Sequence, residues 1–397
     1  MKKIHKLLSA ALILCLLAVV GTSVATADTN KVLYSYGDLF SSRDLQQTAD
    51  LTGATAYTLA DGQDIRITAA GVYVLSGTAA DVTVYVEAGK DDKVQLVLDG
   101  VSVTNQDFPA IYVKSADKVF VTTSADSTVS VTGAFASDGD TKTDGVIFSK
   151  SDLTLNGTGT LTISSTKNGV VSKDDLKVTG GTYSITAASK ALEAKDSIRV
   201  ADGTLDLTAG MDALHAENSD DDEKGYIYIG GGTLTLRAGD DAIHANSAVQ
   251  IDNGTVSVTA SEGIEATYIQ LNGGTISVNA SDDGINAANK SSAYRATVEI
   301  TGGDITVVMG PGDTDGIDSN GDIIVTGGTI NVTGNSTFDC DGSAQYTGGT
   351  IIVNGQQISY IPNQMMGGMG GRGGMGGWGG DPGGQGGKGG RGGRGGW

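Results

Sequence analysis

The feature that most constrains the fold of this chain is an internal repeat of about 22 residues. Successive units begin with Gly-Gly-Thr or a close variant, and they start 22, 22, 29, 22, 20, 29, 25 and 21 residues apart. Their first residues are Thr160, Thr182, Thr204, Thr233, Thr255, Thr275, Asp304, Thr329 and Thr350. A period of this length, extended in places by insertions, indicates a solenoid whose units stack on one another.

Each unit contains three short apolar patterns, and each pattern predicts one strand. The first pattern alternates after Gly-Gly-Thr, as Leu205 and Leu207 do. The second is an Asp-Gly-Ile-x-Ala segment, represented by Ile264, and the third holds an apolar pair such as Val249 and Ile251. Three strands per turn predict an all-β, three-sided parallel β-helix, in which each turn pairs its backbone with both neighbours. A β-sandwich is the competing fold, but the hairpin rhythm of about 8–12 residues is missing.

The composition agrees with a narrow aliphatic solenoid. Aromatic residues make up only 5% of the 397 residues, whereas 61 residues are Gly. Stacked Val, Ile and Leu fill a thin interior without large rings, which accounts for the scarcity of aromatics. Gly-Gly and Asn-Gly pairs are expected at the corners, where the backbone needs positive φ.

The N-terminal segment has the features of a secretory signal. A basic stretch at residues 2–6 precedes an apolar run at 7–20 and an Ala-Thr-Ala site at 25–27. The apolar run is shorter than the roughly 20 residues that span a bilayer. We therefore expect removal of residues 1–27 and a secreted, extracellular or cell-surface protein with no transmembrane segment.

The remaining chain divides by composition. Residues 28–90 predict a β-rich N-terminal cap or early turns, and residues 91–364 predict the β-helix. Residues 365–397 contain 20 Gly among 33 residues, with scattered Arg, Lys and Trp, which predicts a disordered tail. That tail is either a plain flexible extension or a basic strip that attaches the protein to the anionic cell wall.

Charge and cysteine content exclude several classes of protein. The formal net charge of −20 makes nucleic acid a poor partner, because phosphate binding needs a basic surface. Removal of the signal leaves Cys340 as the single cysteine, so an intramolecular disulfide is impossible. Stability must then come from the architecture or from a bound metal, and the expected state is a monomer.

The second strand of each unit carries polar residues that the repeat aligns in two columns. One column reads Asp144, Asn168, Lys190, Asp212, Asp241, Glu262, Asp283 and Asp315. Three residues further on, the other reads Glu193, His215, His244, Glu265, Asn286 and Asp318. Stacked carboxylates repel each other by about 1 kcal/mol even in water. Folding does not require this arrangement, and the Gly or Ala between the columns leaves space for an ion or a sugar.

Clustered carboxylate oxygens with interspersed amides are the ligands that Ca²⁺ prefers. The candidate metal ligands are Asp212, Asp240, Asp241, Glu262, Glu265, Asp282, Asp283, Asp313, Asp315, Asp318, Asp339 and Asp341. The alternative is that these acids form solvated Asx turns at the corners, each harmless by itself. His215 and His244 are only weak evidence for a transition metal in this oxygen-rich surrounding. We expect them to form hydrogen bonds or, with Asn286, to contact a sugar.

The two 29-residue units place their extra residues at the same point, after the second strand. The insertions are 218–225 and 289–295, so both should leave the solenoid along one edge. They bring Tyr226, Tyr294 and Arg295 toward the acidic face as expected walls of a shallow groove. Aromatic faces with hydrogen-bonding groups suit carbohydrate, although each tyrosine alone could be an ordinary half-buried residue.

Several motifs resemble one known family. One motif is residues 92–105, which read Asp-Lys-Val-Gln-Leu-Val-Leu-Asp-Gly-Val-Ser-Val-Thr-Asn. The other motifs are residues 109–120, residues 173–182, the Asp-Gly-Ile-x-Ala units and the Gly/Met-rich tail. Together they resemble the secreted carbohydrate-binding β-helix proteins of clostridia. The resemblance implies a right-handed parallel β-helix similar to polysaccharide lyases, with calcium at the acidic corners. It also implies binding of cellulose and pectin-like acidic sugars. The chain departs from the pattern at Glu262, His215 and His244.

Three functions follow from these observations. The first is a non-catalytic extracellular binder of cellulose or polygalacturonate-like glycans, in which Ca²⁺ bridges uronate carboxylates to the acidic columns. The second is a calcium-dependent polysaccharide lyase in which Lys190 removes the C5 proton, unless Lys190 merely forms salt bridges in its column. The third is a structural surface or adhesin protein that calcium stiffens.

Overall fold

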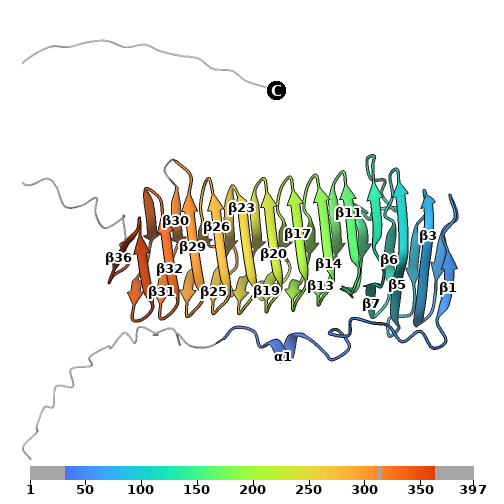
Figure 1. Ribbon diagram of the computed structural model, residues 1–397, viewed down its shortest axis with the longest axis horizontal. Helices are drawn as coiled ribbons and strands as arrows, with labels where there is room; N and C mark the ends of the chain where they lie inside the picture. The colour runs from blue at the N-terminus through green and yellow to red at the C-terminus, as the bar shows by residue number, and fades with distance from the viewer. Residues whose placement is uncertain (1–31, 312–313, 363–397) are drawn as a thin grey trace, which may run out of the picture.

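The computed structural model describes residues 32–311 and 314–362. The expected signal at 1–27, the Gly-rich segment at 365–397 and the candidate ligand Asp313 lie outside these residues. The described chain forms 36 strands and a single short helix, α1 (Tyr36–Leu39). Strands one turn apart in the sequence pair in parallel along a long stack (Figure 1), which is the arrangement of a β-solenoid. The expectation of an all-β solenoid is confirmed.

The Gly-Gly-Thr pattern forms one ladder of parallel strands, named here the Thr ladder. From Thr160 onward, each strand of this ladder begins at the residue that heads a repeat. The Thr ladder contains β8 (Ser127–Val131), β11 (Thr160–Ser165), β14 (Thr182–Ala187), β17 (Thr204–Ala209), β20 (Thr233–Ala238), β23 (Thr255–Ala260), β26 (Thr275–Ala280), β29 (Asp304–Met309), β32 (Thr329–Thr333) and β35 (Thr350–Val353).

The Asp-Gly-Ile pattern forms a separate sheet, named here the acidic ladder. Its outward side chains include the two polar columns. The acidic ladder contains β2 (Ile65–Ile67), β4 (Val84–Glu87), β6 (Ile111–Ser115), β9 (Gly145–Ser149), β12 (Asn168–Ser172), β15 (Leu192–Ala194), β18 (Leu214–Ala216), β21 (Asp241–Ala245), β24 (Glu262–Ala266), β27 (Ile285–Ala287), β30 (Asp315–Ser319) and β33 (Ser336–Cys340).

The third pattern forms the strap ladder, so named for the segment that covers it. The strap ladder contains β7 (Lys118–Thr123), β10 (Asp152–Gly157), β13 (Asp175–Val178), β16 (Ser197–Val200), β19 (Tyr226–Ile229), β22 (Ala248–Ile251), β25 (Tyr268–Leu271), β28 (Thr297–Ile300), β31 (Asp322–Val325) and β34 (Ala344–Tyr346). At the N-terminal end, the long strand β5 (Lys93–Asn105) pairs with both β7 and β8.

The remaining strands lie at the two ends of the stack. Strand β3 (Gly71–Ala80) pairs with β5, and β1 (Thr55–Thr58) pairs with β3. At the other end, β36 (Gln356–Ile358) folds back antiparallel onto β35. No helix in the described part of the chain is long and apolar enough to cross a membrane.

Gly-Gly corners join the strap ladder to the Thr ladder. The second Gly of the pair has positive φ in turn after turn, for example 84° at Gly274 and 88° at Gly303. Glycine adopts this region without steric cost, which explains why it recurs immediately before the first residue of each unit. Inside the corners, aliphatic side chains stack in register, as Leu234, Val256 and Ile276 do, with at most 1% exposure.

The small residues between the two polar columns face the core, not the outer surface. Ala191, Ala213 and Ala242 are fully buried in the main hydrophobic cluster. In later turns the position is Gly: a Cβ on Gly284 would lie 2.4 Å from the Gly316 carbonyl oxygen and 2.5 Å from Val307 Cγ1. The expectation that these residues leave space for an ion or a sugar is therefore wrong. They are small because neighbouring turns approach closely inside.

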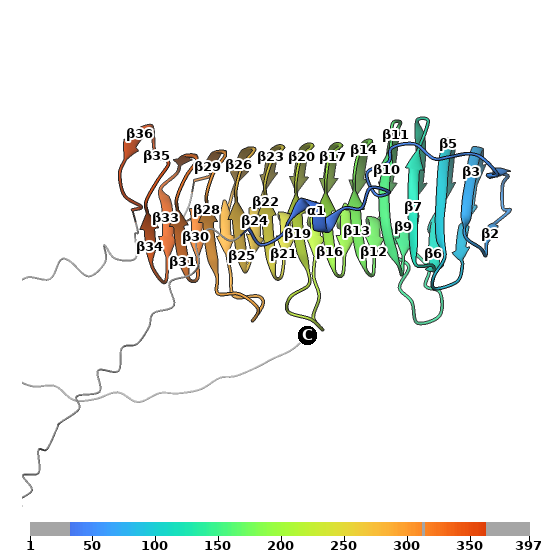
Figure 2. The same ribbon diagram turned by 90° about the horizontal axis from the view of Figure 1, so that it is seen from below.

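Residues 33–47, named here the strap, lie along the outside of the strap ladder (Figure 2). The Gln250 side chain accepts from the Tyr34 backbone N–H at 2.7 Å and donates to its carbonyl at 2.9 Å. The Tyr34 ring stacks on Tyr226 with 4.2 Å between centroids. Near the other end, Gln47 donates to the Thr179 carbonyl at 2.9 Å. The strap is part of the region 28–90 that was expected to form a cap or early turns, and it covers one side of the solenoid (Figure 2).

A buried ion cluster anchors the strap. The Asp44 side chain is 1% exposed, and it lies 3.1 Å from Lys177 Nζ and 3.2 Å from Lys118 Nζ. Burial alone would raise the pKa of Asp44, but hydrogen bonds from Ser41 and the two lysines outweigh it and lower the pKa to about 2. Removal of this carboxylate would leave buried positive charge without compensation.

Gly284→Ala should destabilise the protein by about 1–3 kcal/mol, because the added methyl group overlaps the backbone of the next turn. Urea unfolding followed by circular dichroism measures the change. Gly310→Ala is the matched control, since the nearest atom to its Cβ would be at 3.4 Å. Equal stability of the two variants would contradict the close approach of turns at Gly284.

Asp44→Asn should destabilise the wild-type fold by about 3 kcal/mol at neutral pH and release the strap to protease. The carboxylate has a pKa of about 2 in the folded state, against roughly 3.9 when unfolded. Its stabilising effect is therefore complete above about pH 4 and disappears as the pH falls toward 2.

The difference in unfolding free energy between wild type and Asp44→Asn should accordingly shrink between pH 4 and 2. Asp38→Asn, at an exposed position of α1, is the control and should match wild type. A difference that stays constant down to the lowest pH would show that the Asp44 charge does not hold the strap.

Candidate functional site

Strand pairing places the polar residues of the acidic ladder in the two predicted columns. The second column is continuous in register from Glu193 through His215, His244, Glu265, Asn286 and Asp318 to Asp339. In the first column Asp241 pairs with Glu262 directly. The prediction fails at its first member, because Gly145, and not Asp144, pairs with Asn168.

Upstream of Glu193 the second column consists of aromatic and aliphatic residues, not of acids. Tyr85, Tyr112, Phe148 and Val171 continue it in register, and the last three are fully buried. The Tyr112 hydroxyl donates to Asp138 at 3.0 Å, so the loop between β8 and β9 lies against these rings. The ionic part of the column therefore begins at Glu193, and the candidate site is confined to the turns that follow.

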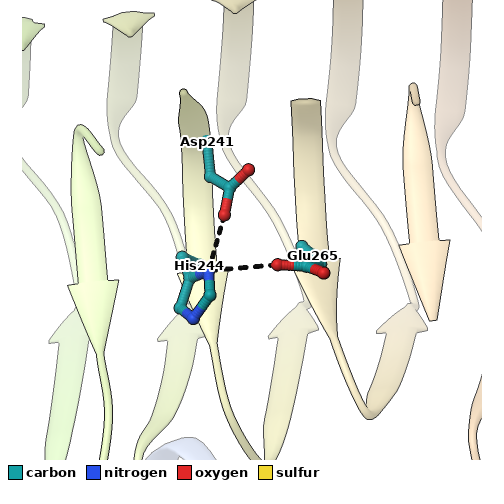
Figure 3. Close-up of side chains that lie close together, drawn as sticks. All are labelled: Asp241, His244 and Glu265. Carbon is teal, nitrogen blue, oxygen red and sulfur yellow. Dashed lines mark hydrogen bonds and ion pairs between the residues drawn. The ribbon is translucent and has the colours of Figure 1, made fainter. Parts of the chain in front are cut away.

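A hydrogen-bonded histidine cluster occupies the middle of the acidic ladder (Figure 3). His244 Nδ1 lies 2.5 Å from an Asp241 oxygen and 3.1 Å from a Glu265 oxygen. Burial disfavours the imidazolium, but the hydrogen bonds to both carboxylates outweigh burial and raise the pKa of His244 to about 9. At neutral pH a proton on Nδ1 thus holds the two carboxylates together. Lys290 Nζ lies 2.8 Å from the same Glu265 carboxylate.

One turn earlier, Asp212 and His215 repeat the arrangement. Their Oδ2 and Nδ1 atoms are 2.7 Å apart, and both residues are buried. The rings of His215 and His244 stack with 4.7 Å between centroids and 14° between planes. Each histidine is therefore hydrogen-bonded to the acid three residues before it, as one of the two expected roles required, and contact with a sugar stays a prediction.

An all-oxygen cluster lies further along the same ladder. Carboxylate oxygens of Asp315, Asp318 and Asp339 all lie within 4.8 Å of one another. Burial, followed by the charges of Asp283 and Asp315, raises the pKa of Asp318 to about 7. A raised carboxyl pKa means that negative charge is under-compensated here, and a cation would relieve that.

Glu262, between the two clusters, has the same character. Burial and the charges of Asp241 and Glu265 raise its pKa to about 7. Its Oε2 atom is buried and has no hydrogen-bond partner among the residues that the structure describes. The other candidate acids Asp240, Asp282 and Asp341 are exposed at the corners, whereas Asp283 is half-buried and accepts from the Asp315 backbone N–H.

Two adjoining cavities lie over the N-terminal part of the ionic columns. The larger, about 590 Å³, is lined by Asp212, His215, Asp241, His244 and Lys290, among others. The smaller, about 330 Å³, shares Lys190 and His215 with it. Lys190 itself is 3.8 Å from Glu193. The columns thus border a hollow large enough for sugar rings.

The two insertions meet over this hollow. Ser291 Oγ donates to the Asp222 carbonyl at 2.6 Å, and the Ser292 side chain bonds to the Asp222 carboxylate. Asn218 and Asp222 line the larger cavity. Emergence of both insertions along one edge, as predicted from their positions, is therefore observed.

The aromatic walls expected for the groove lie elsewhere. Tyr226 is in β19 of the strap ladder, buried under Tyr34. Tyr294 packs on Tyr268, with 5.7 Å between centroids, and Arg295 pairs with Asp322 at 2.6 Å. The structure brings none of the three to the histidine cluster, and the insertions contribute Lys290 and Asp222 instead.

Three comparisons place the chain among known proteins. The family described as "Carbohydrate-binding domain-containing protein" matches residues 61–311 and 260–361. A carbohydrate-binding domain-containing protein of Acetivibrio thermocellus is 34% identical over 193 residues, which cover 45% of this chain and 64% of that relative. The alignment thus spans less than two thirds of the relative's length.

A solved structure also matches: a polysaccharide lyase-like protein from C. thermocellum, in a gadolinium derivative. It is 33% identical, with a TM-score of 0.48, and the match covers 52% of this chain and 90% of that chain.

Proposed function

Because the chain belongs to the carbohydrate-binding domain-containing family, we propose that it is a secreted, non-catalytic binder of plant cell-wall polysaccharide. The proposed ligands are cellulose and polygalacturonate-like acidic glycans, and the binding surface is the outer face of the acidic ladder. The observation that carries the proposal is the pair of polar columns beside two joined cavities on one face. We also propose that the solenoid is a right-handed, three-sided parallel β-helix, which the three ladders of strands support.

Calcium is proposed to assist the binding of acidic sugars. The residues that would hold it are Asp315, Asp318 and Asp339, with Asp283 one turn earlier. Their donor atoms are carboxylate oxygens, as Ca²⁺ requires, and the raised pKa of Asp318 indicates uncompensated charge. When bound, Ca²⁺ would supply positive charge for a uronate carboxylate on an otherwise acidic surface. The residues present therefore fit the ion.

The protein's own side chains account for the remaining contacts. The sugar rings would rest in the larger cavity, which His215, Asn218 and Asn246 help to line. Lys190 and Lys290, at either side, would attract the carboxylates of an acidic glycan. Parallel stacking repeats similar groups turn after turn, which suits a polymer that also repeats.

A polysaccharide lyase is the second candidate, favoured by one observation. Lys190 borders the same cavities as the hydrogen-bonded pair Asp212–His215, so a base lies beside a possible sugar subsite. β-Elimination would need that base to take the C5 proton of a uronate while a C4–C5 double bond forms and the C4–O bond breaks, and the leaving oxygen would take a proton from water to become a hydroxyl group. Ultraviolet absorbance of unsaturated products distinguishes this reaction from binding alone.

Retention of the protein on insoluble polygalacturonate should fall about tenfold or more when EDTA removes calcium, whereas retention on cellulose should not change. Asp318→Asn should reproduce the loss in the presence of calcium. Asp304→Asn, an exposed acid of the Thr ladder, is the matched control and should bind as wild type does.

Unchanged retention after EDTA would refute the calcium proposal. Failure to bind either polymer would refute the polysaccharide proposal itself. A rise in ultraviolet absorbance that Lys190→Ala abolishes would establish the lyase in place of the non-catalytic binder.

A further inference from the structure

The acidic ladder contains two groups of metal-ligating side chains that differ in their donor atoms. Asp315, Asp318 and Asp339 offer oxygen alone, whereas Asp241, His244 and Glu265 offer one imidazole nitrogen and two carboxylates. We propose that this second group is a separate site for a transition-metal ion of the Zn²⁺ class, at the floor of the larger cavity.

The geometry of the three side chains suits one small ion. Their donor atoms lie within 4.8 Å of one another, with His244 Nδ1 at 2.5 Å from Asp241 and 3.1 Å from Glu265. Zinc–ligand bonds of about 2.0–2.2 Å place the ligands of a tetrahedral ion roughly 3.4 Å apart. If the three side chains moved outward by less than about 1 Å, a metal ion could therefore replace the proton that His244 Nδ1 shares with the carboxylates.

The backbone holds these ligands in place. His244 and Glu265 are direct register partners in β21 and β24, and Asp241 precedes His244 by three residues on the same strand. Asp241 is 6% exposed and Glu265 is 8% exposed. Ligands on paired strands lose little freedom when an ion binds, and their burial limits competition from water.

The surrounding charge favours a cation. Glu262 lies beside Asp241 across the strand pair, and within the described part of the chain no group forms a hydrogen bond with its buried Oε2 atom. Asp212 lies one turn earlier in the same column. Among the described residues, Lys290 is the lysine that contacts the group, at 2.8 Å from Glu265. The Lys290 side chain is 29% exposed, so it can move into solvent when an ion takes its place at Glu265.

The donor set selects the class of ion. Ca²⁺ takes six to eight oxygens, and a single imidazole nitrogen with two carboxylates does not supply them. One nitrogen and two oxygens from the protein, with a fourth position left for an outside ligand, are typical of an open zinc site. Asp241 and His244 both line the cavity, so a sugar oxygen or water could take that fourth position.

The experiment uses the untagged full chain, stripped with EDTA and returned to excess Ca²⁺. Calorimetry with Zn²⁺ should show one binding site. Bound Co²⁺ should give the visible absorption of a four-coordinate ion, and addition of Zn²⁺ should displace the Co²⁺ and remove that absorption. His244→Gln should lower the affinity for Zn²⁺ by more than the roughly 10–100-fold that is typical when a residue that only hydrogen-bonds to a metal ligand is lost. Glu265→Gln should also weaken it, and thermal unfolding checks that each variant is folded.

Two control variants make the assignment specific. His215→Gln removes the stacked histidine of the previous turn, which is outside the group, and should retain Zn²⁺ binding. Asp318→Asn disrupts the oxygen cluster and should also retain it. The proposal is overturned if excess Ca²⁺ abolishes the Co²⁺ spectrum, or if folded His244→Gln and Glu265→Gln bind Zn²⁺ as wild type does. Neither result bears on glycan retention, so this site and the proposed function fail separately.

Discussion

Backbone pairing between successive turns is the interaction on which the rest of the structure depends. Within the three ladders, each internal strand pairs in parallel with its equivalents one turn before and one turn after, so side chains at equivalent positions must stack in columns. Inside, this stacks Leu234 on Val256 and yields a continuous aliphatic core. Outside, the same rule stacks carboxylates that repel one another. The fold therefore concentrates charge along one face, and protons, lysines or metal ions have to compensate it.

The chain compensates that charge differently along its length. At the middle turns a proton shared by His244 and its carboxylates, together with Lys290, balances the ladder. At the later turns no histidine stands in the column, and the raised pKa of Asp318 records the surplus charge. On the strap ladder, by contrast, a segment of the chain supplies Asp44 to buried lysines. The face of the acidic ladder, which borders the two cavities, is thus the one left open to an outside ligand.

The repeat allowed the ladders and most of the column register to be predicted, because side-chain alignment follows directly from a constant turn length. Asp144 was misplaced by one residue because the long loop between β8 and β9 breaks the constant turn length, so that Gly145 pairs with Asn168. Tyr226 was assigned to the groove because sequence position does not reveal which side of a corner a residue faces. The strap was missed because it belongs to no repeat. Tyr34, Tyr36 and Phe40, three aromatics within seven residues of an aromatic-poor chain, were the available signal.

The proposed acidic polysaccharide would bind to the outer face of the acidic ladder through its ionic columns. A crystal structure of the full chain with calcium and an oligogalacturonate tests this most directly. We expect sugar density across the columns between Lys190 and Asp339, with carboxylates directed at lysine or at calcium. Sugar density on the Thr ladder, or beneath a displaced strap, with the acidic ladder bare would contradict it.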